Sequence, residues 1–313
     1  MKQVKNFLKM VNPFNNMEAM PIPLFIVKKI LAFVFIYLAA GILGEAIVIG
    51  GLTVAGYDPL HGVMPNQNIS MLIPYYVFIL FALVTFIYCR IVEKRSPKSM
   101  GFNRRIFDYI TGMIIAVVML AVIMLLCSAF GGISYLGIDK NVNWLYIIAL
   151  LGGLLIQGAA EEALCRGFLM TTLSKKVPEW LTVICTATAF AFPHFTTIFE
   201  SDLQYAIIGV INLYLVSTVF SLLVLIRSNI WVACGLHSIW NFLLYGVFGL
   251  NLSGSEANGT GILCFRTEGA NIINGGVYGI ESSIVTTVIL GIAVIILLYI
   301  RRKVKYRGEK NGI

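Results

Sequence analysis

The chain has 313 residues, of which 58% are hydrophobic and only 12% are charged, and its mean hydropathy is +0.87. Soluble domains are typically about a quarter charged, so this composition excludes a soluble globular domain and indicates a polytopic helical membrane protein. The net charge is +8, but the basic residues gather in short loops between apolar segments. That distribution is a topology signal and argues against a nucleic-acid partner.

About eight apolar segments are long enough to cross a bilayer as helices. In chain order they are 24–52, 70–90, 108–130, 143–173, 179–195, 205–226, 229–250 and 278–300. The first and fourth are longer than a bilayer requires, which predicts tilted, broken or protruding helices. We therefore predict an all-α integral membrane protein of about eight transmembrane helices, in contact with the lipid bilayer.

The sequence predicts one membrane domain with two basic flanks. Residues 1–23 are expected to form an interfacial N-terminal arm, residues 24–300 the membrane domain, and residues 301–313 a basic cytoplasmic tail. All but two of the 23 Lys and Arg residues fall on one side of the predicted topology; the exceptions are Lys140 and Arg266. By the positive-inside rule, both termini are expected to be cytoplasmic.

The fourth span ends with three ionisable residues, Glu161, Glu162 and Arg166. An ionised group at the centre of a bilayer costs roughly 2.5–3.5 kcal/mol even on the most lenient scale, so such a cluster indicates a functional site. Glu162 and Arg166 are four residues apart and share a helix face, where they can pair. Glu161 is turned by about 100° from Glu162. We expect Glu162 to be structural and Glu161 to point into a cavity as a general base.

Two later spans repeat the four-residue spacing. Phe190 and His194 lie on the fifth span, and His237 and Asn241 lie on the seventh. Residues four apart share a helix face, so the three helices are expected to enclose a polar centre. His194 is fifteen residues past Glu179 and therefore deep in the membrane. It can reach the depth of the other motifs only if the fifth helix begins outside the bilayer or tilts strongly.

In order along the chain, these motifs are Glu-Glu-x-x-x-Arg (161–166), Phe-x-x-x-His (190–194) and His-x-x-x-Asn (237–241). Together they resemble the three motifs of the CAAX-protease and bacteriocin-processing family, which includes the Ras-converting CAAX endopeptidase and the Abi proteins. The resemblance covers roughly residues 70–300. The late run 274–283, Asn-Gly-Gly-Val-Tyr-Gly-Ile-Glu-Ser-Ser, also resembles bacterial members, which implies a bacterial plasma membrane.

The resemblance implies an intramembrane endopeptidase that acts on a membrane-associated peptide or protein. Its catalytic residues would be Glu161 and His194, which activate water, and His237 and Asn241, which stabilise the oxyanion. Supporting roles would fall to Glu162, Arg166 and Phe190.

The sequence leaves two mechanisms open, one metal-free and one with zinc. Two histidines and a glutamate form a known ligand set for catalytic zinc, and here they would be Glu161, His194 and His237. However, the His-Glu-x-x-His pattern of zinc proteases is absent, so these ligands would have to converge from three helices.

Two other functions are compatible with the same residues. One is a non-catalytic member of the same fold that acts in bacteriocin immunity or as a scaffold. The other is an ion-coupled transporter, in which the glutamates and histidines would form a proton path. No internal or inverted repeat stands out in the sequence, which disfavours a transporter.

Overall fold

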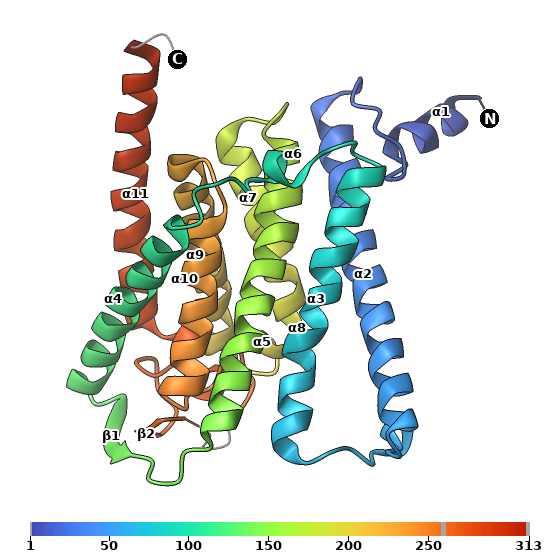
Figure 1. Ribbon diagram of the computed structural model, residues 1–313. Helices are drawn as coiled ribbons and strands as arrows, with labels where there is room; N and C mark the ends of the chain where they lie inside the picture. Colours follow the sequence, from blue (N-terminus) through green and yellow to red (C-terminus); the bar gives the residue numbers. More distant parts are fainter. Residues whose placement is uncertain (1, 258–260, 311–313) are drawn as a thin grey trace.

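The computed structural model describes residues 2–257 and 261–310. They form a bundle of long helices that run up and down, with a short amphipathic helix at one end and two short strands at the other (Figure 1). This architecture confirms the all-α membrane class predicted from the composition.

The long helices correspond to the predicted spans, whereas the two strands were not predicted. The α-helices are α1 (Lys2–Val11), α2 (Ile22–Val54), α3 (Gln67–Ile91), α4 (Asp108–Ala129), α5 (Trp144–Glu162), α6 (Thr171–Leu173), α7 (Glu179–Ala191), α8 (Phe195–Ile198), α9 (Leu203–Arg227), α10 (Trp231–Phe242) and α11 (Ile284–Lys310). The π-helical segments are η3 (Ala163–Met170) and η5 (Leu243–Val247), and a 3₁₀ turn, η4 (Phe192–His194), joins α7 to α8. The strands β1 (Ile133–Ile138) and β2 (Leu263–Thr267) pair antiparallel.

Within the described residues, seven helical segments are long and apolar enough to cross a membrane. The remaining predicted span, 229–250, corresponds to the short helix α10 followed by η5. Every residue of α10 from Val232 to Asn241 is buried, so this helix is surrounded by protein. The number of spans therefore stays a prediction, because α10 is interior but short.

The predicted flanks differ slightly from the structure. α2 begins at Ile22, so the arm ends two residues earlier than expected. The stretch 301–310 is not a separate tail, because α11 continues through it to Lys310. Residues 311–313 of the predicted tail lie outside the described residues. Helix α1 and the end of α11 lie at the same end of the bundle (Figure 1).

Helix α10 lies close to its neighbours because glycine replaces a side chain at the contacts. A Cβ on Gly235 would come within 2.0 Å of the backbone oxygen of Tyr109 in α4. A Cβ on Gly158 in α5 would meet Ser238 of α10 at 2.4 Å. Small residues allow such close approach between membrane helices. The packing fixes the His237 helix against the Glu161 helix.

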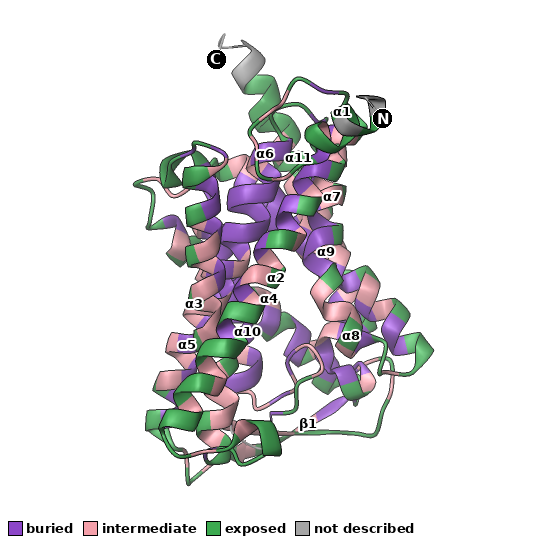
Figure 2. Cartoon of the chain, turned by 90° about the vertical axis from the view of Figure 1, so that its right-hand side faces the viewer, coloured by how far each residue is buried: buried purple, intermediate pink, exposed green. Residues whose placement is uncertain are grey.

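Buried residues line the inner faces of the bundle, and exposed residues cover its outer faces (Figure 2). In α9, 56% of the most apolar window is buried, whereas in α11 only 17% is buried. An apolar exposed surface of this kind is stable in lipid and not in water. The polar residues of the three motifs thus lie inside a bundle whose outside is apolar.

Ion pairs join helix ends at the end of the bundle where α1 lies. Lys29 Nζ lies 2.6 Å from Glu93 Oε1, and Arg301 Nη2 lies 2.8 Å from Glu179 Oε2 at the start of α7. In the predicted topology, most basic residues lie on this side of the membrane. Charged groups near helix ends are much less costly than charged groups at mid-membrane. The cytoplasmic location of both termini stays a prediction.

Candidate active site

Glu162 is locked into a buried ion pair. Its carboxylate and the Arg166 guanidinium are both fully buried, and Arg166 Nη1 donates to Glu162 Oε1 at 3.0 Å. Arg166 lies in η3, the π-helical segment that directly continues α5. Pairing between these residues was predicted from their spacing and is present in the structure.

Arg166 also donates hydrogen bonds to α9, and its guanidinium packs on aromatic rings from α7 and α9. Its Nη2 atom donates to the backbone oxygen of Ser217 at 3.0 Å and to the Ser217 hydroxyl at 2.5 Å. The guanidinium lies over the rings of Phe190 and Phe220, 4.8 and 5.0 Å from their centroids. A planar guanidinium stacks well on aromatic faces and is weakly hydrated, which suits it to burial. Arg166 therefore ties three helices together.

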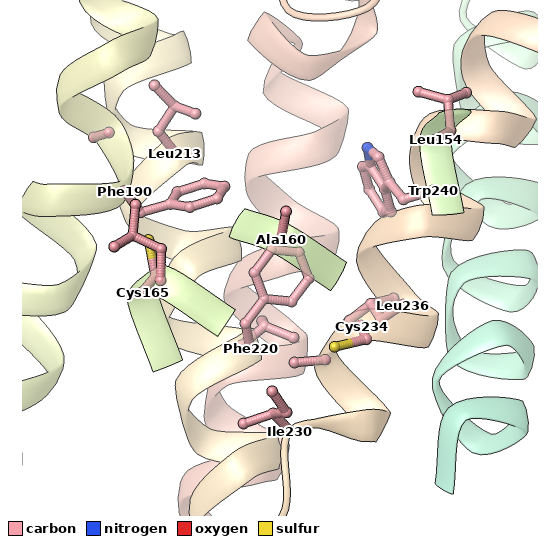
Figure 3. Close-up of a cluster of buried hydrophobic side chains, with 14 of the residues drawn as sticks. Leu154, Ala160, Cys165, Phe190, Leu213, Phe220, Ile230, Cys234, Leu236 and Trp240 are labelled. Carbon is pink, nitrogen blue, oxygen red and sulfur yellow. The ribbon is translucent and has the colours of Figure 1, made fainter. Parts of the chain in front are cut away.

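The apolar surroundings of this ion pair form a continuous core. The Phe190 and Phe220 rings meet edge to face, with centroids 5.9 Å apart. Figure 3 shows both rings among the buried side chains of this region, together with Ala160 and Cys165. This core excludes water. If one partner of the Glu162–Arg166 pair is removed, water therefore cannot solvate the charge that remains.

Glu161 faces a cavity of about 210 Å³. Its side chain is 15% exposed, whereas that of Glu162 is 0% exposed. One wall of the cavity is aromatic and comes from α2 and α3; its residues are Phe33, Tyr37, Phe78 and Phe81. The structure thus places the two adjacent carboxylates in different environments, as their angular separation predicted.

Gln157 connects Glu161 to the seventh-span motif. Its Nε2 atom donates to Glu161 Oε1 at 3.1 Å, and its Oε1 atom accepts from Asn241 Nδ2 at 3.2 Å. Gln157 also borders the cavity. Gln157 was not among the predicted site residues, although its position four residues before Glu161 was a usable signal.

His237 lies between the two glutamates. Its Nδ1 atom is 3.1 Å from Glu162 Oε1, and since a carboxylate can only accept, Nδ1 is the donor. Its Nε2 atom is 3.9 Å from Glu161 Oε2, too far for a direct hydrogen bond. The ring stacks on Phe220, with centroids 5.2 Å apart. A carboxylate on Nδ1 fixes the ring and directs Nε2 toward Glu161.

His194 borders the same cavity as Glu161, at the η4 turn. α7 ends at Ala191, and Pro193, which has no backbone N–H to continue the helical hydrogen bonds, lies in the turn that follows. His194 Nδ1 donates to the backbone oxygen of Phe190 at 3.1 Å, so Nε2 of the neutral ring is an acceptor. Among the described residues, no ion pair joins His194 to either glutamate. His194 and Glu161 therefore line the same cavity without forming an ion pair among the described residues.

The predicted zinc ligands are not assembled as a set. In the part of the chain that the structure describes, no group of three or more His, Cys, Asp or Glu side chains could hold a metal ion. Glu161 and His237 are near each other, but His194 is not within ion-pair distance of Glu161. Participation of zinc stays a prediction.

Comparison with known families adds an independent finding. Residues 143–243 match the family described as Rce1-like, type II CAAX prenyl endopeptidase Rce1-like. No protein with a curated description matches the chain. The matched segment contains all three motifs, from Glu161 to Asn241. The match confirms the resemblance to CAAX proteases over the segment that carries these motifs, and it supports a protease at the level of the family.

Proposed function

We propose that this protein is an intramembrane endopeptidase that hydrolyses a peptide bond in a membrane-associated protein or peptide. The observation that carries this proposal is that Glu161 borders a cavity and lies 3.9 Å from His237 Nε2, while the neighbouring Glu162 is neutralised by Arg166. One carboxylate is thus available for chemistry, and the other supports the fold.

In this proposal Glu161 is the general base. The 3.9 Å between Glu161 Oε2 and His237 Nε2 allows both atoms to contact one water molecule. Glu161 takes a proton from that water, and the oxygen attacks the carbonyl carbon of the scissile peptide. The proton then passes to the leaving nitrogen as the C–N bond breaks, which gives a carboxylate and an amine. His194 Nε2 accepts a hydrogen bond from the same water or from the substrate.

His237 and Asn241 are proposed to stabilise the oxyanion. Because His237 Nδ1 already donates its hydrogen to Glu162, the ring can donate from Nε2 to the oxyanion only as an imidazolium. Asn241 Nδ2 carries two hydrogens, of which one goes to Gln157, so the other can be donated to an oxygen in the site. Gln157 in turn connects Asn241 to Glu161. Donors held in place by such contacts stabilise a developing negative charge without reorganising.

The substrate is proposed to be an apolar, membrane-embedded or membrane-anchored polypeptide. The cavity joins a polar wall, with Glu161, Gln157 and His194, to an aromatic wall from α2 and α3. The polar wall can form hydrogen bonds with a peptide bond. An apolar group beside that bond is stabilised when it leaves water or packs on the aromatic rings.

We further propose a bacterial plasma-membrane location, with both termini in the cytoplasm. The basic residues at one side of the topology support this orientation, as does the placement of α1 and the end of α11 at one end of the bundle (Figure 1).

The test compares peptide termini in membranes from cells that carry the wild-type protein or Glu161→Ala at matched levels. Termini that disappear in Glu161→Ala would support proteolysis and would identify both substrate and cleavage site. Glu45→Ala is the matched control, because Glu45 is another glutamate of a membrane span and lies exposed on α2. If no terminus changes, the proposal fails, and the immunity or scaffold function becomes the better explanation.

A further inference from the structure

The run 274–283 has no role in the mechanism above, yet it is built into the bundle. Asn212 of α9 donates from Nδ2 to the backbone oxygens of Glu281 and Ser283, at 2.8 and 3.0 Å. Tyr278 and Ser282 are 1% and 0% exposed. A loop with this much buried polar backbone is held by specific contacts and is not a simple connection to α11.

The Glu281 carboxylate binds two separate segments. Its Oε1 atom accepts from Trp240 Nε1 at 3.2 Å. Its Oε2 atom accepts from the backbone nitrogen of Ser253 at 2.6 Å and from the Ser253 hydroxyl at 3.1 Å. Trp240 immediately precedes Asn241, a proposed oxyanion donor. Glu281 therefore connects the catalytic helix α10 to the loop that contains Ser253.

Ser253 has an unusual backbone conformation. Its φ is +49°, which places a residue other than glycine in the left-handed region. Such a conformation costs of order 1–3 kcal/mol and persists only where the surroundings impose it, as they often do at functional sites. Here the bonds to Glu281 impose it. Ser253 also borders the cavity that contains Glu161 and His194.

The hydrogen bonding of Ser253 determines what it can offer to a ligand. A hydroxyl has one hydrogen to donate and two lone pairs that accept. Because an ionised carboxylate only accepts, the Ser253 hydroxyl donates its hydrogen to Glu281. The Tyr278 hydroxyl interacts with the Ser253 side chain and can take one lone pair of Oγ, which leaves the other for a ligand in the cavity. Ser253 is therefore prepared to accept a hydrogen bond from an N–H group.

We propose that Ser253 is a substrate-binding residue that accepts a hydrogen bond from a backbone N–H of the bound polypeptide, and that Glu281 is the positioning residue that holds it. The peptide as ligand rests on the proposed peptidase function. The placement of Ser253 at the cavity and its dependence on Glu281 rest on the contacts alone.

The first test uses Ser253→Gly on a synthetic peptide that contains a cleavage site identified through Glu161-dependent termini. Glycine adopts φ of +49° without strain, so this variant removes the hydroxyl and keeps the loop conformation. We expect KM to rise about three- to tenfold, as for the loss of one net hydrogen bond, with little change in kcat. An unchanged KM would overturn the binding role.

The matched control is Ser255→Gly, because Ser255 lies exposed in the same turn. Glu281→Gln is expected to raise KM as Ser253→Gly does, since it weakens the contacts that hold Ser253. The exposed Glu256 supplies its control, Glu256→Gln. Combining Ser253→Gly with Glu281→Gln should raise KM no further than either change alone. Additive increases would contradict a positioning role for Glu281.

A second test does not depend on activity. Ser253→Cys and Ser255→Cys are compared for reaction with a membrane-impermeant maleimide, after the partly exposed Cys185 and Cys264 are replaced by Ala. We expect Ser253→Cys to react several times more slowly than Ser255→Cys, and added Glu281→Gln to accelerate it. Equal reaction rates of the two cysteine variants, with no change on adding Glu281→Gln, would overturn the placement of Ser253 at the cavity. An absence of Glu161-dependent termini would instead overturn the proposed function and, with it, the peptide ligand.

Discussion

Glu161 and Glu162 are adjacent in the chain, yet their carboxylates lie in opposite environments. Glu162 accepts from Arg166 and His237 and is completely buried. Glu161 borders a cavity and accepts one hydrogen bond, from Gln157. One step of about 100° around a helix is enough to separate the two surroundings. The comparison teaches that a membrane protein can keep two adjacent glutamates in its interior if one is neutralised by a buried cation and the other borders a cavity.

The largest expected effect is a loss of stability when the buried carboxylate Glu162 loses its ion-pair partner. Arg166→Ala leaves Glu162 buried without its cation, and breaking a buried ion pair costs about 3–5 kcal/mol. We expect a large fall in the unfolding temperature of the detergent-solubilised protein. The exposed Arg302 gives the control variant Arg302→Ala, for which we expect almost no change. Equal stability of the two variants would refute the structural role of the Glu162–Arg166 pair.

A smaller effect, on the cleavage rate, is expected around Glu161, the carboxylate that borders the cavity. Gln157→Leu removes the contact that orients Glu161 and connects it to Asn241. We expect the cleavage rate to fall about tenfold, equivalent to about 1.4 kcal/mol, with only a minor change in unfolding temperature. Gln204→Leu, at an exposed position of α9, is the matched control. A loss of stability as large as that of Arg166→Ala would contradict the separation between a structural Glu162 and a Glu161 that borders the cavity.

The smallest effect concerns a charge pair far from both carboxylates. Glu18 in the N-terminal arm accepts from Lys175 Nζ at 2.8 Å, and this hydrogen bond holds the pKa of Glu18 below its usual value. A lowered pKa adds stability at pH values above the unfolded pKa of 4.5, and this stability is lost as the pH falls through the folded pKa.

Because both side chains are more than a third exposed, solvent screening limits the contribution of this pair to less than about 1 kcal/mol. Glu18→Gln should therefore slightly reduce the loss of unfolding temperature between pH 7 and pH 4. The measurement is the unfolding temperature at both pH values, with Glu256→Gln as the control. A pH dependence identical to that of the wild-type protein would show that the arm is not held by this pair.

Local spacing predicted the parts of the site that lie on one helix. The four-residue separation of Glu162 and Arg166 sufficed to predict their contact, and the helical turn sufficed to point Glu161 elsewhere. The apolar spans likewise predicted most of the long helices, although the last one, predicted at 278–300, runs from Ile284 to Lys310. The interior helix α10 showed the limit of that reasoning, because its neighbours cover it and it need not span the bilayer alone.

Contacts between helices could not be predicted from spacing. Ser217 and Phe220 meet Arg166 only because α9 packs against η3, and nothing in their own segment indicates an arginine partner. Ser253 reaches the cavity through a loop that Glu281 holds from 28 residues further along the chain. Such contacts depend on how the bundle closes, which a pattern along one helix does not encode.

The most direct test of the central claim measures peptide cleavage and unfolding temperature together for Glu161→Gln and Glu162→Gln. The account predicts that Glu161→Gln unfolds at nearly the wild-type temperature but loses cleavage by about 10²–10⁴-fold, as expected for the loss of a general base. It predicts that Glu162→Gln unfolds at a clearly lower temperature, because Arg166 loses its anion. Retained cleavage in Glu161→Gln, or equal destabilisation of both variants, would contradict the division of roles between the two carboxylates.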